Sequence, residues 1–257
     1  MNPSILLLLI PTLLAKGHPT IPANRIVGGQ PADISEAPFL VSVLYYGYYE
    51  CAGSLLSSRW LLTAADCIYL GVRYTVRANS SAVDQGGVLA EVQSVVVHPR
   101  YSLYDRDYNF ALMELDRDVE VKFAELPGFD WVPEEGAALD AFGWGGSWDS
   151  WNYELRRGSL SVMNRDECQE LVWDEFVVTD RLICAGSDKG GDNLSYGDVG
   201  GPLLEGHTLL GVASYSYGDG WYIYPAIFGR VSSVLEVSSG GAKFAESHHQ
   251  RRENDDS

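Results

Sequence analysis

The ten residues from Asn193 to Pro202, NLSYGDVGGP, constrain the fold of this chain more than any other segment. Three of them, Gly197, Gly200 and Gly201, are glycines, the residue used where the backbone turns tightly or packs too closely for a side chain. Asp198 and Pro202 are also turn-forming residues. The segment therefore predicts a tight turn whose conformation would not accept bulkier side chains.

The rest of the chain has the composition of a β protein. Its 257 residues include 27 Gly and 11 Pro, which favour many short strands joined by turns. This length suits one large all-β unit or two smaller domains. Residues 39–49, FLVSVLYYGYY, alternate β-branched and aromatic side chains around Gly47 and predict a hairpin.

The N-terminus has the pattern of a secretory signal. An apolar run from Ile5 to Leu14 is followed by Ala15-Lys16-Gly17, which has small residues at the usual cleavage positions. We expect residues 1–17 to be a signal peptide and the mature protein to be secreted and extracellular. The run contains Pro11, and no later segment reaches transmembrane length, so we expect no membrane insertion.

Charge and cysteine content exclude several classes of function. The net charge of −17 repels polyanions, so we expect no nucleic-acid partner. The four cysteines are an even set in a secretory context, which favours two disulfides over metal ligation or redox chemistry. No His, Cys, Asp or Glu group has ligand spacing, so we expect neither a metal nor a cofactor.

Several motifs resemble those of the trypsin/chymotrypsin-like serine proteases, in the family's order. The family turn C-x-G-D-S-G-G-P corresponds to Ser195–Pro202, and C-G-G-x-L…W-L-L-T-A-A-H-C corresponds to Cys51–Cys67. The resemblance covers Ile26 to Val237 and implies an all-β fold of two six-stranded antiparallel barrels with a short C-terminal helix. Further matching segments are Val92–Tyr101, Asp107–Leu115, Ala141–Gly145, Leu209–Tyr215 and Pro225–Val231.

The resemblance also locates the catalytic triad, and all three residues differ. Val199 stands where the family has its nucleophilic Ser, Asp66 where it has His, and Asn109 where it has Asp, unless an unusual register brings Asp107 there. His98 is expected at a strand end and not as a base. Because acyl transfer needs a nucleophile, a base and an orienting acid, we expect no enzyme but a pseudoprotease.

Other family positions follow from the same comparison. It implies oxyanion-hole amides at Gly197 and Val199, and disulfides that pair Cys51 with Cys67 and Cys168 with Cys184. It places residues 18–25 as an activation peptide ending at Arg25, after which the Ile26 ammonium would pair with Asp198. The domain would span residues 26–237, followed by a disordered polar tail, residues 238–257. The specificity pocket would be narrowed by Asn193, Leu194, Ser216 and Ala226.

Two surface features bear on partners. Asn79-Ser80-Ser81 is a glycosylation sequon, whereas Asn193-Leu194-Ser195 is a second one that we expect to stay unmodified. Many Tyr and Trp residues fall in the loops expected to rim the cleft, where such rings suit protein recognition as well as packing of the loops themselves. They are Tyr45, Tyr46, Tyr48, Tyr49, Tyr101, Tyr104, Trp148, Trp151, Tyr153, Tyr196, Tyr215, Tyr217, Trp221, Tyr222 and Tyr224.

We therefore expect a monomeric, proteolytically inactive serine protease homologue that binds proteins or regulates proteolytic cascades. Its partner would be a protease, an inhibitor or a cascade component. One alternative is an adhesion or ligand-sequestering protein unrelated to proteases. A minor alternative is a residual serine hydrolase with a displaced nucleophile, Ser195 or Ser214.

Overall fold

The computed structural model describes residues 29–145, 154–172, 176–186, 192–216, 224–238 and 241–244. The predicted signal peptide and activation peptide, with Arg25 and Ile26, lie outside these residues, as do the rim residues Trp148, Trp151, Tyr153, Tyr217, Trp221 and Tyr222. The strands are β1 (Gln30–Pro31), β2 (Leu40–Tyr45), β3 (Tyr48–Leu55), β4 (Trp60–Thr63), β5 (Tyr74–Ala78), β6 (Val88–Val97), β7 (Ala111–Leu115), β8 (Ala138–Gly143), β9 (Arg156–Val162), β10 (Leu182–Gly186), β11 (Pro202–Glu205), β12 (Thr208–Tyr215), β13 (Ala226–Arg230), β14 (Leu235–Ser238) and β15 (Gly241–Phe244).

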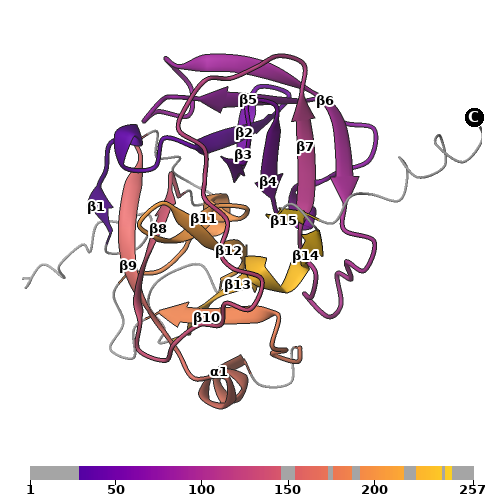
Figure 1. Cartoon of the computed structure of the whole chain (residues 1–257). Helices are drawn as coiled ribbons and strands as arrows, with labels where there is room; N and C mark the ends of the chain where they lie inside the picture. Colours follow the sequence, from indigo (N-terminus) through magenta and orange to yellow (C-terminus); the bar gives the residue numbers. More distant parts are fainter. Residues whose placement is uncertain are drawn as a thin grey trace, which may run out of the picture.

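The first barrel is closed by six antiparallel strands in the order β2-β3-β4-β7-β6-β5, seen at the top of Figure 1. The predicted hairpin joins β2 to β3, with Tyr45 paired to Tyr48. Both turn residues have positive φ, 49° at Tyr46 and 84° at Gly47, which is the pattern of a two-residue type I′ turn. A tyrosine in this left-handed region is unusual, because the conformation favours Gly or Asn.

The second barrel lies below the first in Figure 1 and is formed by β9-β10-β13-β12-β11-β8. The pairing of β8 with β9 closes it, and the short β1 adds to the outer side of β9. Together the two barrels confirm the predicted all-β architecture.

Each barrel has its own apolar interior because alternate strand residues point inward. In β7, for example, Ala111, Met113 and Leu115 are buried while the residues between them are partly exposed. One core cluster includes the fully buried Leu61 and Leu62 and extends to Val212 of the second barrel, and another includes the fully buried Leu203 and Phe228.

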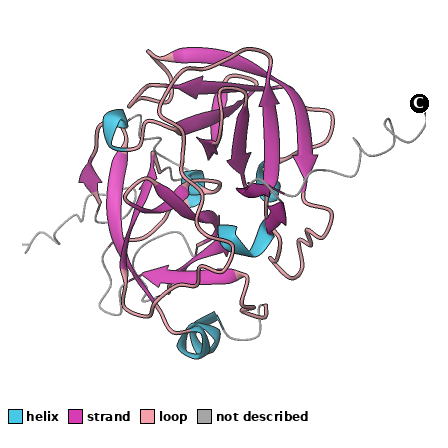
Figure 2. Ribbon diagram, in the orientation of Figure 1, coloured by secondary structure: helices cyan, strands magenta, loops and turns pink. Residues whose placement is uncertain are grey.

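Helices are few, as Figure 2 shows. The only α-helix among the described residues is α1 (Arg165–Val172), and the rest are 3-10 turns: η1 (Ile34–Glu36), η2 (Ala65–Cys67), η3 (Tyr196–Asp198) and η4 (Val231–Val234). The short C-terminal helix takes the form of η4. It is followed by the β14–β15 hairpin, whose second strand falls within the predicted polar tail. None of the helices in the described ranges is long and apolar enough to cross a membrane.

The two disulfides join the pairs that the resemblance implies. Cys51 bonds Cys67 with the Cα atoms 6.1 Å apart, and Cys168 bonds Cys184 at 6.3 Å. The first connects β3 to η2 in the first barrel. The second connects α1 to β10 in the second barrel.

Candidate functional site

The glycine-rich turn of residues 197–201 is the joint between the barrels. The Ala52 amide of β3 donates a hydrogen bond to the Val199 carbonyl over 2.8 Å, and the Gly200 amide donates to the Ala213 carbonyl over 2.8 Å. A Cβ at Gly200, where φ is +82°, would lie 2.2 Å from the Ala52 carbonyl oxygen and 2.3 Å from Thr63 Oγ1. The turn is therefore held between β3 and β12, and only glycine fits at position 200.

Asp66 and Asn109 are in direct contact at this joint. Asp66 lies in η2, and its backbone amide donates to Asn109 Oδ1 over 2.9 Å. Asn109 Nδ2 donates to Asp66 Oδ2 over 2.8 Å and to Ser214 Oγ over 2.7 Å. Asn109 is fully buried, and both polar atoms of its side-chain amide are hydrogen bonded. This amide therefore links the two barrels.

The Asp66 carboxylate has two further partners. The Tyr101 hydroxyl donates to Oδ1, and Arg106 Nη1 lies 3.5 Å from Oδ2. Burial, and then the Asp66 carboxylate, raise the pKa of Tyr101, so this phenol stays protonated as the donor. The Arg106 guanidinium also lies 4.6 Å from the ring centre of Tyr215 at the end of β12. It thereby bridges a first-barrel loop to the second barrel.

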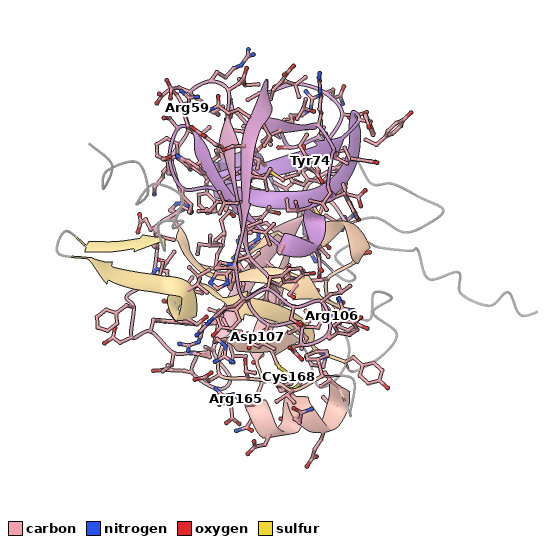
Figure 3. The ribbon with its side chains drawn as sticks, turned by 90° about the vertical axis from the view of Figure 1, so that its right-hand side faces the viewer. Arg59, Tyr74, Arg106, Asp107, Arg165 and Cys168 are labelled. Atoms are coloured by element: carbon pink, nitrogen blue, oxygen red, sulfur yellow. A yellow bond between two sulfur atoms is a disulfide. The ribbon has the colours of Figure 1, made fainter. Side chains whose placement is uncertain are left out.

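Asp107 does not take part in this network. Its buried carboxylate accepts two hydrogen bonds from Arg181, 2.8 Å from Nε and 2.6 Å from Nη2. Figure 3 shows Arg106 and Asp107 between Tyr74 of the first barrel and Arg165 of α1. The register therefore gives Asn109, and not Asp107, to the site. His98 lies directly after β6, where its ring stacks on Tyr108 with the ring centres 4.8 Å apart.

Behind the turn, a buried acid stands without a cation among the described residues. Asp198 accepts hydrogen bonds from the amides of Gly145 over 2.7 Å and Ser195 over 2.8 Å. Burial is the largest influence and raises the pKa of Asp198 to about 6, although both amides act in the opposite direction. The neighbouring Gly197 carbonyl accepts a hydrogen bond from the buried Tyr49 hydroxyl.

The four residues predicted to line a specificity pocket are bonded to one another or packed in the core. Asn193 Nδ2 donates to the Tyr224 carbonyl over 2.9 Å, and Asn193 Oδ1 accepts from the Leu194 amide over 2.8 Å. Ser216 Oγ donates to the Leu194 carbonyl over 3.0 Å. Leu194 and Ala226 pack in the core of the second barrel and are 3% and 0% exposed.

The two sequons differ in accessibility. Asn79 is exposed at the end of β5 with φ of 55°, whereas Asn193 is 7% exposed and its amide is hydrogen bonded. Glycosylation at Asn79 stays a prediction.

The sequence analysis did not name Arg106, and it placed Tyr101 and Tyr49 only among the aromatics expected to rim the cleft. A signal for Arg106 was available, because a partly buried carboxylate at position 66 is stabilised by a nearby cation. Arg106 lies in the loop that leads to Asn109 and could have been proposed on that ground. Tyr49 was grouped with the rim aromatics, but it is 7% exposed and packs against Trp144 with ring centres 5.8 Å apart.

Similar proteins include several insect proteases. "Trypsin 5G1" of Aedes aegypti is 39% identical over 222 residues, which cover 83% of this chain and 84% of that protein. "Trypsin" of Simulium vittatum is 34% identical over 221 residues, covering 80% and 88%. "Vitellin-degrading protease" of Bombyx mori is 30% identical over 233 residues, covering 87% and 88%.

These relatives contradict the prediction that the chain is not an enzyme. Proteins 34% and 39% identical over most of its length are named trypsins, which points to an active serine protease. We correct the prediction accordingly. The Val199 side chain has no nucleophilic atom, so hydrolysis by this chain would have to use another side chain as the nucleophile.

The match to the family is broad. The trypsin family model matches residues 26–237, a range that contains both barrels, both disulfides and the joint between them. With relatives of 30% identity or more covering most of its length, this chain belongs to the trypsin family.

Proposed function

We propose that this trypsin-family chain binds a polypeptide partner at the joint between its barrels. The partner is a protease, an inhibitor or a component of a proteolytic cascade. Asp66, Asn109 and Val199 stand at the triad positions in this proposal, with the Gly197 and Val199 amides at the oxyanion hole. The observation that carries it is the position of Arg106, which pairs with Asp66 and covers Tyr215.

A fixed ion pair at the joint between the barrels suits recognition. The side chains of Asp66 and Arg106 are 18% and 30% exposed, so each is accessible in part while its geometry is set by neighbours. A partner that meets such groups loses little entropy, because they are already ordered. Arginine and tyrosine are also the residue types that most often dominate binding energy at protein interfaces.

The specificity pocket supports binding that does not depend on a deep Arg or Lys anchor. Asn193 has its amide occupied by Tyr224 and Leu194, and the Leu194 side chain is packed in the core. We infer that a partner lies along the rim near Arg106 and Tyr215 instead.

Processing belongs to the same proposal. We infer that residues 1–17 are removed on secretion, that the Arg25 bond is cleaved, and that the new Ile26 ammonium pairs with Asp198. The buried carboxylate of Asp198, which forms no ion pair among the described residues, supports this last step, since an unpaired buried charge is costly. We also infer a glycan at Asn79 and a monomeric mature protein.

The test is binding to an immobilised Kunitz-type trypsin inhibitor, measured by surface plasmon resonance with the cleaved chain. We expect Arg106→Gln to weaken binding about tenfold, because it removes the charge that faces the partner. Arg117→Gln is the matched control, since Arg117 pairs with Asp116 on an exposed surface and should change nothing. Equal affinity of the two variants, or no binding by the wild type, would overturn the proposal.

A second candidate is peptide hydrolysis by Ser214 or Ser195. The relatives named trypsins favour it, and Ser214 Oγ is linked through Asn109 to the Asp66 carboxylate. Labelling with a fluorophosphonate probe tests it directly. Label that disappears in Ser214→Ala or Ser195→Ala would establish the displaced nucleophile, whereas an unlabelled wild-type protein would exclude it.

A further inference from the structure

A cluster of four tyrosines, Tyr45, Tyr46, Tyr69 and Tyr74, lies on the first barrel beside Glu50. Tyr45 is at its centre, with its ring centre 4.6 Å from Tyr46, 5.9 Å from Tyr69 and 6.4 Å from Tyr74. The Tyr69 hydroxyl donates a hydrogen bond to Glu50 Oε1 over 3.0 Å. The Glu50 carboxylate is thus bonded to the hydroxyl of one ring of the cluster.

The cluster is both ordered and accessible. Tyr74 is buried, and its hydroxyl accepts a hydrogen bond from the Tyr69 amide over 2.6 Å, which fixes the loop after η2. Tyr46 and Tyr69 are nevertheless 67% and 48% exposed. Burial, and next the Glu50 carboxylate, raise the pKa of Tyr69 to about 12, so its hydroxyl remains a donor to Glu50 at neutral pH.

The cluster has no cation in the described part of the chain. There, no Arg or Lys forms an ion pair with Glu50, and none lies over these four rings. The same chain places guanidinium groups over other tyrosines: Arg181 and Arg100 lie 4.9 Å and 5.4 Å from the ring centre of Tyr108. A carboxylate beside aromatic faces is the chemistry that attracts a cation.

We propose that Glu50 and the tyrosine cluster bind an Arg or Lys side chain of a partner polypeptide. The inference rests on the proposed function, since it assigns a second contact surface to the same binding protein. The surface continues from the joint, because Tyr69 follows the turn η2 that carries Asp66.

An extended polypeptide fits this surface better than a small free cation. The rings are too open to enclose a small ligand, which usually needs a concave site that buries most of its surface. Leu70, next to Tyr69, is fully exposed and offers apolar contact beyond the cation. The chain's net charge of −17 also draws cationic segments toward it.

The experiment uses a short fluorescein-labelled peptide of alternating Arg and Gly, with the full chain, and fluorescence anisotropy as the readout. We expect Glu50→Gln to weaken binding about fivefold. Tyr46→Asn should weaken it by a similar factor. Asn keeps the type I′ turn, because Asn-Gly is a preferred sequence there, so this variant removes the ring without breaking the hairpin.

Two controls separate a local site from general attraction. Glu205→Gln makes the same charge change in β11 of the second barrel, and it should leave affinity within about twofold. A peptide with citrulline in place of Arg has nearly the same shape without charge and should not bind. Equal losses in Glu50→Gln and Glu205→Gln, or equal binding of the citrulline peptide, would overturn the inference.

The result is independent of the inhibitor experiment. If Arg106→Gln weakened inhibitor binding but the chain did not bind the Arg peptide, only the proposed site at Glu50 and the tyrosine cluster would be ruled out. Arg-peptide binding that depends on Glu50, in a chain that binds no inhibitor, would leave the cation site in place and remove the proposed partner class.

Discussion

Asn109 is the single residue on which the polar joint depends most. Its amide donates to Asp66 and to Ser214, and a carboxylate at this position could not donate to either. We expect Asn109→Asp to reduce the free energy of unfolding by about 3 kcal/mol at neutral pH, because it buries a second carboxylate against Asp66. Chemical denaturation measures the difference.

The double variant Asp66→Asn with Asn109→Asp is the control for that substitution. It restores one amide and one carboxylate at the same two positions, so the hydrogen bond between them can re-form with its direction reversed. We expect it to recover at least half of the lost stability. If the double variant lost as much stability as the two single variants together, positions 66 and 109 would not be coupled.

The turn from η3 to β11 is the element that joins the two barrels, and its backbone leaves no room at Gly200. We expect Gly200→Ala to lower the free energy of unfolding by more than about 3 kcal/mol, because its Cβ would overlap the Ala52 carbonyl and Thr63 Oγ1. Thermal melting of the purified variant measures this.

Gly206 offers a matched comparison in the next turn. It also has positive φ, 61°, but a Cβ there meets no atom within 4 Å. Gly206→Ala should therefore cost only the strain of the left-handed backbone, about 1 kcal/mol. If both alanine variants melted at the same temperature, the close approach at Gly200 would not be important for stability.

The turn from η3 to β11 could be predicted from the sequence because glycines are needed where the backbone makes close contacts. That signal is local and specific. The hairpin at Gly47 was predictable for a similar reason, whereas the pairing of Cys51 with Cys67 was implied by the family resemblance. Arg106 was not predictable, because its role depends on a partner distant in the sequence and on a loop that reaches between the barrels. Tyr49 also escaped prediction. Alternation in β3 gives it the inward face, whereas its sequence neighbours Tyr46 and Tyr48 are exposed.

At the scale of the molecule, specific polar contacts join the two barrels. Asn109 and Arg106 reach from the first barrel to Ser214 and Tyr215 of the second. Asp198 lies on the second-barrel side of the joint, next to the Gly197 carbonyl that accepts from Tyr49 of the first. The protonation state of Asp198 therefore bears on how the whole molecule is held together.

The pH dependence of stability follows from the raised pKa of Asp198. Because the folded pKa is about 6 and the ordinary value is 3.8, the folded chain holds the proton more tightly than the unfolded chain. The resulting stabilisation is complete below about pH 4 and is lost as the pH rises through about 6. A shift of this size corresponds to about 3 kcal/mol.

The measurement compares the uncleaved chain, kept intact by Arg25→Gln, with its Asp198→Asn variant. The difference between their unfolding free energies isolates residue 198, since all other titrating groups are shared. We expect wild type to lose about 3 kcal/mol relative to Asp198→Asn between about pH 4 and pH 7.

Cleavage after Arg25 should abolish this decline, because the Ile26 ammonium would stabilise the charged acid and lower its pKa. A flat difference curve before cleavage would mean that Asp198 does not titrate in this range. A curve unchanged by cleavage would mean that the new N-terminus does not reach Asp198.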